Sequence, residues 1–352
     1  MSQGAVGDEG GDEGGDGRGA GALTDVESVR VGQVTRRGDG WLTGVTVVVP
    51  PPGTVGGVDV RGGGPGTHET DALDPRTLVA TVDAVVLTGG SAYGLVTAHG
   101  VQRWLAEHGR GFRVGPGERE VVPIVPAAAV FDLGRGGEFT ASPGEALGYE
   151  AAVAAASPAG TRVERGVVGA GTGALVGRRF KGGVGTASVR LDGDEDGVVV
   201  AALAVVNAFG LPLLPGVPAP AGDGAAGPTH DTPALNTTLA VVATDAALDP
   251  AEVSRTATTA HDGLARALDP VHTLSDGDTV FALATGARPL PAERSARVAS
   301  LVRVQAAAAE AVRRAVLDGV RSAETVTAAG VTYPRWPGPG PGAAGAGDRQ
   351  DA

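Results

Sequence analysis

The sequence predicts a folded protein of mixed helices and strands, and three observations support this class. The chain has 352 residues, which is long enough to bury a full core. Between two low-complexity ends, β-branched runs alternate with segments of helical spacing. Of all residues 42% are hydrophobic and only 3% are aromatic. We therefore expect a core built mainly from Ala, Val and Leu.

Five segments are predicted to be strands. Residues 45–49 (VTVVV) form a β-branched run that ends at three prolines, and residues 82–88 (VDAVVLT) form an apolar run that ends at two glycines. The other three are the apolar runs 198–207, 237–243 and 279–284. Turn-forming residues or strand-end polar residues limit these runs, as is typical of buried strands.

Three segments are predicted to be helices. Residues 95–107 carry apolar residues at helical spacing. Residues 250–268 follow Asp249, whose carboxylate is a suitable N-cap. Residues 292–317 form a long Ala/Val/Arg segment that closes the domain.

Three stretches are rich in glycine or proline and show no period. Residues 1–22 form an acidic, Gly-rich tail and residues 337–352 a second tail, and both are expected to be disordered. Residues 209–235 are a Pro/Gly/Ala segment inside the folded part. A stretch of this length within a domain is typical of a functional or linking segment.

Composition excludes several classes of function. The net charge of −12 argues against a nucleic-acid surface, and the lack of Cys excludes a disulfide scaffold and a thiolate nucleophile. The six histidines show no metal-ligand spacing, and neither a signal peptide nor a membrane span is visible. We expect a soluble cytoplasmic protein with no cofactor, no metal, no nucleic-acid partner and no membrane partner.

The pair Asn236-Thr237 lies where the Pro/Gly/Ala segment meets a predicted strand. A Thr hydroxyl needs a base, and the α-amine of the same residue can serve once the preceding peptide bond is cut. Such an amine has a pKa of about 8, within range of a general base. The alternative is an ordinary loop-to-strand boundary, where Thr is common.

Two further polar groups stand beside predicted strands. Asp276 and Asp278 flank a glycine just before a strand, where one can orient the Thr237 amine and the other the hydroxyl, or where they simply form a turn. Asn207 ends its strand and can donate to an oxyanion, or can be an ordinary strand-end residue.

Two other residues stand out. Lys181 is the only lysine among 28 basic residues, which indicates either a need for a primary amine or compositional bias. Ser91 lies between a strand and a helix, as in a nucleophile elbow, but Tyr93 stands where that motif requires Gly.

Together these segments resemble the DmpA/BapA-type aminopeptidase family, which includes the nylon-oligomer hydrolase. The matching stretches run from about Leu23 to Gly286 and include GGGPGTHETDAL, VDAVVLTGGSAYGL, VGAGTGALVG, KGGVGTAS, LNTTLAVVATDA and HTLSDGDTVFALATG. The resemblance implies an α+β fold, a four-layer αββα sandwich. It also implies a precursor that cleaves itself into an α chain (23–236, with 209–235 before the cut) and a β chain (237–336), and a homotetramer of processed units.

The resemblance also assigns roles to residues of this sequence. Thr237 becomes the nucleophile, where many relatives have Ser. Asp276 and Asp278 take the acidic positions beside it, and Asn207 takes the oxyanion side. A functional Lys of the relatives aligns with either Arg178 or Lys181, which leaves that assignment split. Relatives have Tyr at the position of Phe131, so no phenolic hydroxyl acts from this position, which argues against a nylon-oligomer preference.

The function predicted from the sequence is therefore a self-processing amidohydrolase that cleaves itself between Asn236 and Thr237 and then acts on small peptides or amino-acid amides. Two alternatives remain open at this stage. One is a serine hydrolase that uses Ser91, and the other is a non-catalytic binding or assembly protein that keeps the fold.

Overall fold

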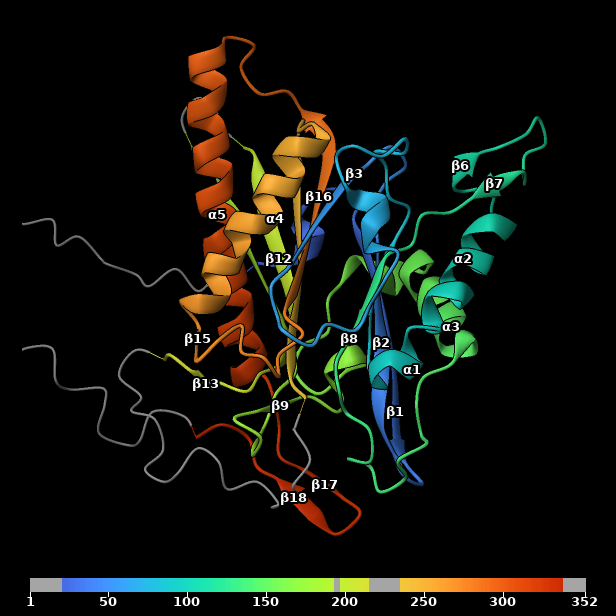
Figure 1. Cartoon of the computed structure of the whole chain (residues 1–352), viewed down its shortest axis with the longest axis vertical. Coiled ribbons are helices and arrows are strands. Elements are labelled where there is room, and N and C mark those ends of the chain that lie inside the picture. Colours follow the sequence, from blue (N-terminus) through green and yellow to red (C-terminus); the bar gives the residue numbers. More distant parts are fainter. Residues whose placement is uncertain (1–20, 193–196, 215–234, 338–352) are drawn as a thin grey trace, which may run out of the picture.

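Two five-stranded sheets lie face to face between two pairs of helices in the computed structural model, which describes residues 21–192, 197–214 and 235–337 (Figure 1). Helices α2 and α3 cover the outer face of the first sheet, and α4 and α5 cover that of the second. This is the four-layer αββα sandwich of the α+β class that the resemblance implied. Residues 1–20, 215–234 and 338–352, where both predicted tails and most of the 209–235 segment fall, lie outside the described residues.

The first sheet has the strand order β1-β2-β5-β8-β4. Its strands are β1 (Arg30–Gly38), β2 (Trp41–Val49), β5 (Val85–Thr88), β8 (Ala127–Ala129) and β4 (Thr67–His68). Strands β5 and β8 are parallel and the other neighbours are antiparallel.

The second sheet has the order β11-β12-β14-β16-β3. Its strands are β11 (Val184–Arg190), β12 (Val199–Asn207), β14 (Thr237–Ala246), β16 (Thr279–Arg288) and β3 (Val55–Val60). Here β14 and β16 are parallel, whereas the remaining pairs are antiparallel. Both strands of the parallel pair therefore begin at the same end of the sheet.

The helices and the small strand pairs complete the fold. The α-helices are α1 (Ser91–Gly94), α2 (Thr97–Glu107), α3 (Glu145–Ala156), α4 (Pro250–Ala265) and α5 (Arg294–Arg321). The 3-10 helices are η1 (Leu23–Asp25), η2 (Thr70–Leu73), η3 (Pro158–Thr161) and η4 (Gly169–Gly171). The two-stranded pairs are β6 (Phe112–Arg113) with β7 (Val121–Val122), β9 (Leu175–Val176) with β10 (Phe180–Lys181), β13 (Leu211–Pro212) with β15 (Leu268–Asp269), and β17 (Val326–Ala328) with β18 (Val331–Tyr333).

The buried side chains of the second sheet alternate between two cores, as the two-residue period of a strand requires. In β12 the odd-numbered residues from Val199 to Val205 face the first sheet, and the even-numbered residues from Val200 to Val206 face α4 and α5. In β14, Leu239 likewise faces the first sheet and Ala240 faces the helices. This parity decides which way the polar residues at the strand ends point.

All eight predicted helices and strands are present, with ends that differ by a few residues. The predicted helix 95–107 begins at Thr97 as α2, and the helix predicted over 250–268 ends at Ala265. One difference concerns the segment 209–235, because its described beginning contains β13 rather than irregular chain only. Pairing with β15 ties this end of the segment to the domain.

Asp249 caps α4 as predicted. Its carboxylate accepts the backbone N–H of Glu252, and the Glu252 side chain accepts the N–H of Asp249 in return. This capping box satisfies two backbone donors that the first turn of a helix leaves without partners.

Asp249→Ala should lower the free energy of unfolding by about 1 kcal/mol, because the helix loses its cap. In a protein of this size that corresponds to a melting temperature lower by about 1.5 °C. Thermal unfolding followed by circular dichroism measures the difference. Asp249→Asn, which keeps an acceptor oxygen, should unfold close to the wild type, and an Ala variant as stable as the Asn variant would contradict the cap.

Candidate active site

Thr237 is the first residue of β14, in the centre of the second sheet between β12 and β16. It lies directly opposite Asn207, the last residue of β12. Both residues are odd-numbered, so by the parity of their strands they face the layer between the two sheets. Asn236 and Thr237 are only 1% and 3% exposed. The peptide bond between them is therefore buried.

The carbonyl group of Asn236 accepts two hydrogen bonds. The backbone N–H of Gly277 donates to its oxygen at 2.9 Å, and the hydroxyl of Thr237 donates to the same oxygen at 2.5 Å. On the other side, the N–H of Asn236 donates to the carbonyl of Ser275 at 2.9 Å. The peptide before Thr237 is thus held in strand-like pairing with the segment that precedes β16.

Asp278 binds backbone groups next to Thr237. One carboxylate oxygen accepts the N–H of Thr238 at 2.7 Å. The other accepts the backbone N–H of His272 at 3.1 Å and lies 2.8 Å from Nδ1 of the same histidine. Both oxygens of this buried carboxylate are therefore occupied.

Asp276 is also buried, but one of its oxygens has no hydrogen-bond partner. Its other oxygen accepts the backbone N–H of Thr273 at 2.8 Å and the Thr273 hydroxyl at 2.6 Å. Burial raises the pKa of Asp276, and the neighbouring charge of Asp278 adds to this rise, whereas hydrogen bonds from Thr273 and from the backbone of Phe209 act against it. A carboxyl group with a raised pKa is suited to exchange a proton.

The two aspartates do not bind the Thr237 hydroxyl in the uncleaved chain. Asp276 pairs with Asn236, and the register places Asp278 beside Thr238. Strand alternation therefore sends these carboxylates to the face opposite that of the Thr237 side chain. What they reach is the backbone at the start of β14, where an α-amine would form after cleavage.

His272 is a site residue that the sequence did not reveal. It precedes Asp278 by six residues in the HTLSDGD segment, and its ring packs edge-on against His261 at 4.8 Å between centroids. Nε2 of His261 lies 3.0 Å from the carbonyl of Asp59. Burial lowers the pKa of His261 to about 4, so this ring stays neutral at physiological pH.

Asn207 is fixed by two donors to its side-chain oxygen. The N–H of Leu175 donates at 3.0 Å and Nη1 of Arg135 at 2.6 Å. Its Nδ2 donates to the carbonyl of Phe131 at 3.4 Å. Arg135, which the sequence analysis did not single out, is half-buried, and desolvation lowers its pKa to about 10. Its Nη1 also donates to the carbonyl of Gly173 at 2.6 Å.

Lys181 is fully buried and supports the same region. Its ammonium group donates to the carbonyl of Thr172 at 3.1 Å and to that of Ala174. These carbonyls belong to the turn whose next residue, Leu175, donates to Asn207. Burial lowers the pKa of Lys181, and the nearby charge of Arg135 lowers it further.

Arg178 and Ser91 lie outside these contacts. Both are half-buried and have a left-handed backbone, with φ of 59° for Arg178 and 51° for Ser91. Within the described part of the chain, neither side chain makes a hydrogen bond or an ion pair. The sequence analysis aligned the functional Lys of the relatives with either Arg178 or Lys181. Of these two residues, only Lys181 contacts the residues around Asn207.

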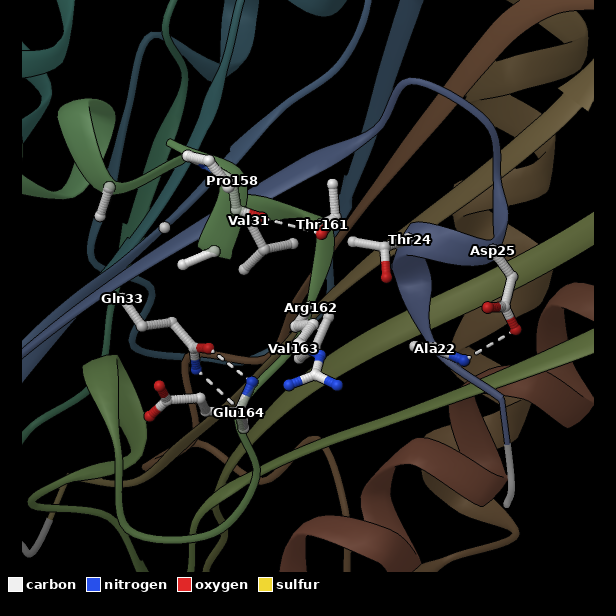
Figure 2. Close-up of a pocket in the computed structure, with 13 residues that line it drawn as sticks. Ala22, Thr24, Asp25, Val31, Gln33, Pro158, Thr161, Arg162, Val163 and Glu164 are labelled. Atoms are coloured by element: carbon white, nitrogen blue, oxygen red, sulfur yellow. Dashed lines mark hydrogen bonds between the residues drawn. The ribbon is translucent and has the colours of Figure 1, made fainter. Parts of the chain in front are cut away.

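Two hollows of the surface lie away from Thr237. One of about 920 Å³ is bordered by η1, β1 and η3, and in it the Gln33 side chain bonds the backbone of Glu164 (Figure 2). None of the predicted site residues lines it. Across residues 21–192, 197–214 and 235–337, no group of three or more His, Cys, Asp or Glu side chains is placed to hold a metal ion. The helices of these same ranges include none with the length and apolar character of a membrane span.

The model of peptidase family S58 matches residues 21–333 of the chain. The chain belongs to this family. An uncharacterized aminopeptidase of Mycobacterium tuberculosis is 48% identical over 338 residues, covering 87% of this chain and 95% of the relative. A 6-aminohexanoate-oligomer endohydrolase of a Kocuria species is 31% identical over 272 residues, covering 71% of each chain. The chain is therefore a hydrolase of the DmpA/BapA type.

Solved structures of this family share the fold. A β-aminopeptidase of a Burkholderia species superposes with a TM-score of 0.68 and 25% identity over 90% of both chains. The L-aminopeptidase D-Ala-esterase/amidase of Ochrobactrum anthropi, a variant of the Ntn-hydrolase fold, superposes with a TM-score of 0.67 and 22% identity, covering 90% of this chain and 89% of the other.

Asp276→Asn should change how stability depends on pH. Because the folded-state pKa of Asp276 is raised above its unfolded value of about 3.9, the folded chain binds more protons between these two values, and stability falls as pH rises through them. The Asn variant lacks this loss. It should match the parent near pH 4 and be more stable at pH 7 to 8, by about 1.4 kcal/mol for each unit of the pKa rise.

Thermal unfolding from pH 4 to 8, with Thr237→Ala in both proteins to keep them uncleaved, measures this difference. Asp278→Asn is the matched control, because an amide nitrogen there would face N–H donors and should destabilise the protein at neutral pH. A stability difference for Asp276→Asn that does not change with pH would contradict the raised pKa of Asp276.

Proposed function

We propose that this hydrolase is a self-processing aminopeptidase of the N-terminal-nucleophile type. It cleaves its own bond between Asn236 and Thr237 and then uses Thr237 to hydrolyse small peptides or amino-acid amides. The hydroxyl of Thr237, 2.5 Å from the carbonyl oxygen of the preceding residue, is the observation that carries the proposal. The aminopeptidase relatives support the same class of substrate.

Maturation proceeds by an acyl shift from nitrogen to oxygen. The Thr237 oxygen attacks the carbonyl carbon of Asn236, the C–N bond breaks, and the hydroxyl proton ends on the released nitrogen. Water then hydrolyses the ester, which leaves a carboxylate on Asn236 and restores the Thr237 hydroxyl. The products are an α chain that ends at Asn236 (23–236 without its tail) and a β chain that begins at Thr237 (237–336 without its tail).

Turnover repeats the acyl chemistry on an external amide. The new α-amine of Thr237 accepts the proton of its own hydroxyl, since an amine with a pKa of about 8 is a fit general base near neutral pH. Asp278, which already binds the Thr238 N–H at 2.7 Å, and Asp276 orient this amine. Asn207 lies opposite Thr237 and stabilises the oxyanion, while Arg135 and Lys181 position Asn207.

The burial of the scissile bond supports an inactive precursor. Asn236 fills the position beside the Thr237 hydroxyl that the substrate's acyl group would take. Cleavage frees Asn236 to leave. The homotetramer of processed units rests on the family resemblance alone, and light scattering of the processed protein tests it.

Purified protein should run as two fragments in denaturing electrophoresis, and sequencing of the smaller one should begin Thr-Thr-Leu-Ala-Val. Thr237→Ala should stay intact and inactive, because it lacks the attacking oxygen. Thr237→Ser should keep both cleavage and activity on amino-acid amides at a reduced rate. Active wild-type protein that remains one intact chain would contradict the proposal.

Ser91→Ala is the control that separates this mechanism from a serine hydrolase. It should cleave and hydrolyse amino-acid amides like the wild type, since the Ser91 hydroxyl makes no hydrogen bond among the described residues. Loss of amidase activity in Ser91→Ala, with the fold retained by circular dichroism, would favour Ser91 as nucleophile instead.

A further inference from the structure

The loop that follows β3 contains three consecutive glycines, Gly62 to Gly64, that the catalytic roles above leave unexplained. β3 pairs with β16 in antiparallel fashion, with Val60 opposite Thr279. The chain that leaves β3 must therefore run alongside the chain that enters β16. That entering chain is the turn formed by Asp276, Gly277 and Asp278.

Backbone hydrogen bonds join the loop to this turn at several points. The N–H of Gly64 donates to the carbonyl of Asp276 at 2.8 Å. The N–H groups of Arg61 and Gly62 both donate to the carbonyl of Asp278, at 3.0 and 3.3 Å. The peptide group before Gly277 and the one after Asp278 are thus both held by the loop.

Gly62 lies too close to the turn to carry a side chain. A Cβ atom at this position would stand 2.3 Å from both the Asp276 carbonyl oxygen and the Asp278 nitrogen. These are backbone atoms, which cannot rotate away, so any side chain at position 62 must displace the turn. By contrast, a Cβ atom on Gly66 would meet only Ala129, with its Cβ at 3.8 Å and its carbonyl oxygen at 3.9 Å, which are ordinary contacts.

Gly277 faces the scissile bond with both its N–H and its bare Cα. The N–H reaches the Asn236 oxygen at 2.9 Å, and a Cβ atom there would stand 2.6 Å from the Thr237 hydroxyl oxygen. Position 277 thus needs glycine so that the nucleophile can lie beside the carbonyl it attacks. The Nδ2 of Asn207 donates to the carbonyl of Phe131 at 3.4 Å.

We propose that the backbone N–H of Gly277 is the group that binds the Asn236 oxygen as it becomes negatively charged during self-cleavage, and that Gly62 is a positioning residue that holds this N–H in place. This inference rests on the proposed self-cleavage of the chain. It adds a backbone donor, present before any cleavage, to the residues that carry the reaction. Removing one oxyanion donor costs about 10²–10³ in rate in enzymes where it has been measured.

The test compares Gly62→Ala with Gly66→Ala, a matched change in the same loop. The half-time of self-cleavage of freshly made precursor should lengthen at least tenfold in Gly62→Ala and stay within about twofold of the wild type in Gly66→Ala. Equal half-times in the two variants would overturn the role of Gly62. Absence of cleavage in the wild type would instead sink the proposed function, and the inference with it.

A second readout reports the hydrogen bond itself. The sequence contains only two asparagines, Asn207 and Asn236, so carbonyl-¹³C-labelled asparagine gives two bands in isotope-edited infrared spectra. In uncleavable Thr237→Ala protein, Gly62→Ala should move the Asn236 band to higher wavenumber, and Gly66→Ala should leave it in place. A band that stays in place in folded Gly62→Ala protein overturns the inference even where the wild type cleaves.

Gly277→Ala provides a third test, which does not depend on Gly62. It should block cleavage and lower the melting temperature, because the added methyl group collides with the Thr237 oxygen. In the double variant with Thr237→Ala, which removes that oxygen, most of the loss in melting temperature caused by Gly277→Ala should disappear. Cleavage of Gly277→Ala at the wild-type rate overturns the proposal. So does a loss of melting temperature on Gly277→Ala that is equal in the parent chain and in Thr237→Ala.

Discussion

Strands β14 and β16 run parallel in the middle of the second sheet, and the contacts around the Asn236–Thr237 bond depend on that shared direction. Parallel neighbours begin at the same edge, so the start of β14 and the turn before β16 are brought together by the ladder itself. The antiparallel strand β12 ends at this edge and adds Asn207. Strand β3, antiparallel to β16, also ends here and delivers the glycine loop. Four segments distant in sequence thus meet through backbone pairing alone.

The low aromatic content of the chain has a structural counterpart in the packing of its layers. Alanine and valine fill both cores of the second sheet, and glycines lie where elements approach closely. A Cβ atom on Gly32 of β1, for example, would stand 1.9 Å from the Ala151 carbonyl of α3. Small side chains shorten the distance between layers, and a dense interior holds backbone groups in fixed positions. That rigidity suits a site whose donors are largely backbone N–H groups.

The sequence predicted the strands and helices that have a clear apolar period, together with the residues at their ends. It did not predict α3, because alanines on every side of this helix leave no apolar stripe to detect. Nor did it single out β1, which is mostly half-buried and carries polar residues. Asn207 and Thr237 were chosen separately from strand ends, but their pairing depends on register, which one sequence does not specify. Arg135 and His272 were missed for the same reason, since each acts through a contact that only the tertiary fold creates.

The complete burial of Lys181 has a practical consequence for handling the protein. It is the only lysine in the sequence, and its ammonium group is enclosed by backbone carbonyls. Reagents that acylate amines at neutral pH therefore find no lysine at the surface of the folded chain. Their targets are α-amino groups instead. If the chain cleaves itself as proposed, each cleaved molecule carries one more α-amino group than its precursor, and stoichiometric amine labelling would count the cleaved molecules.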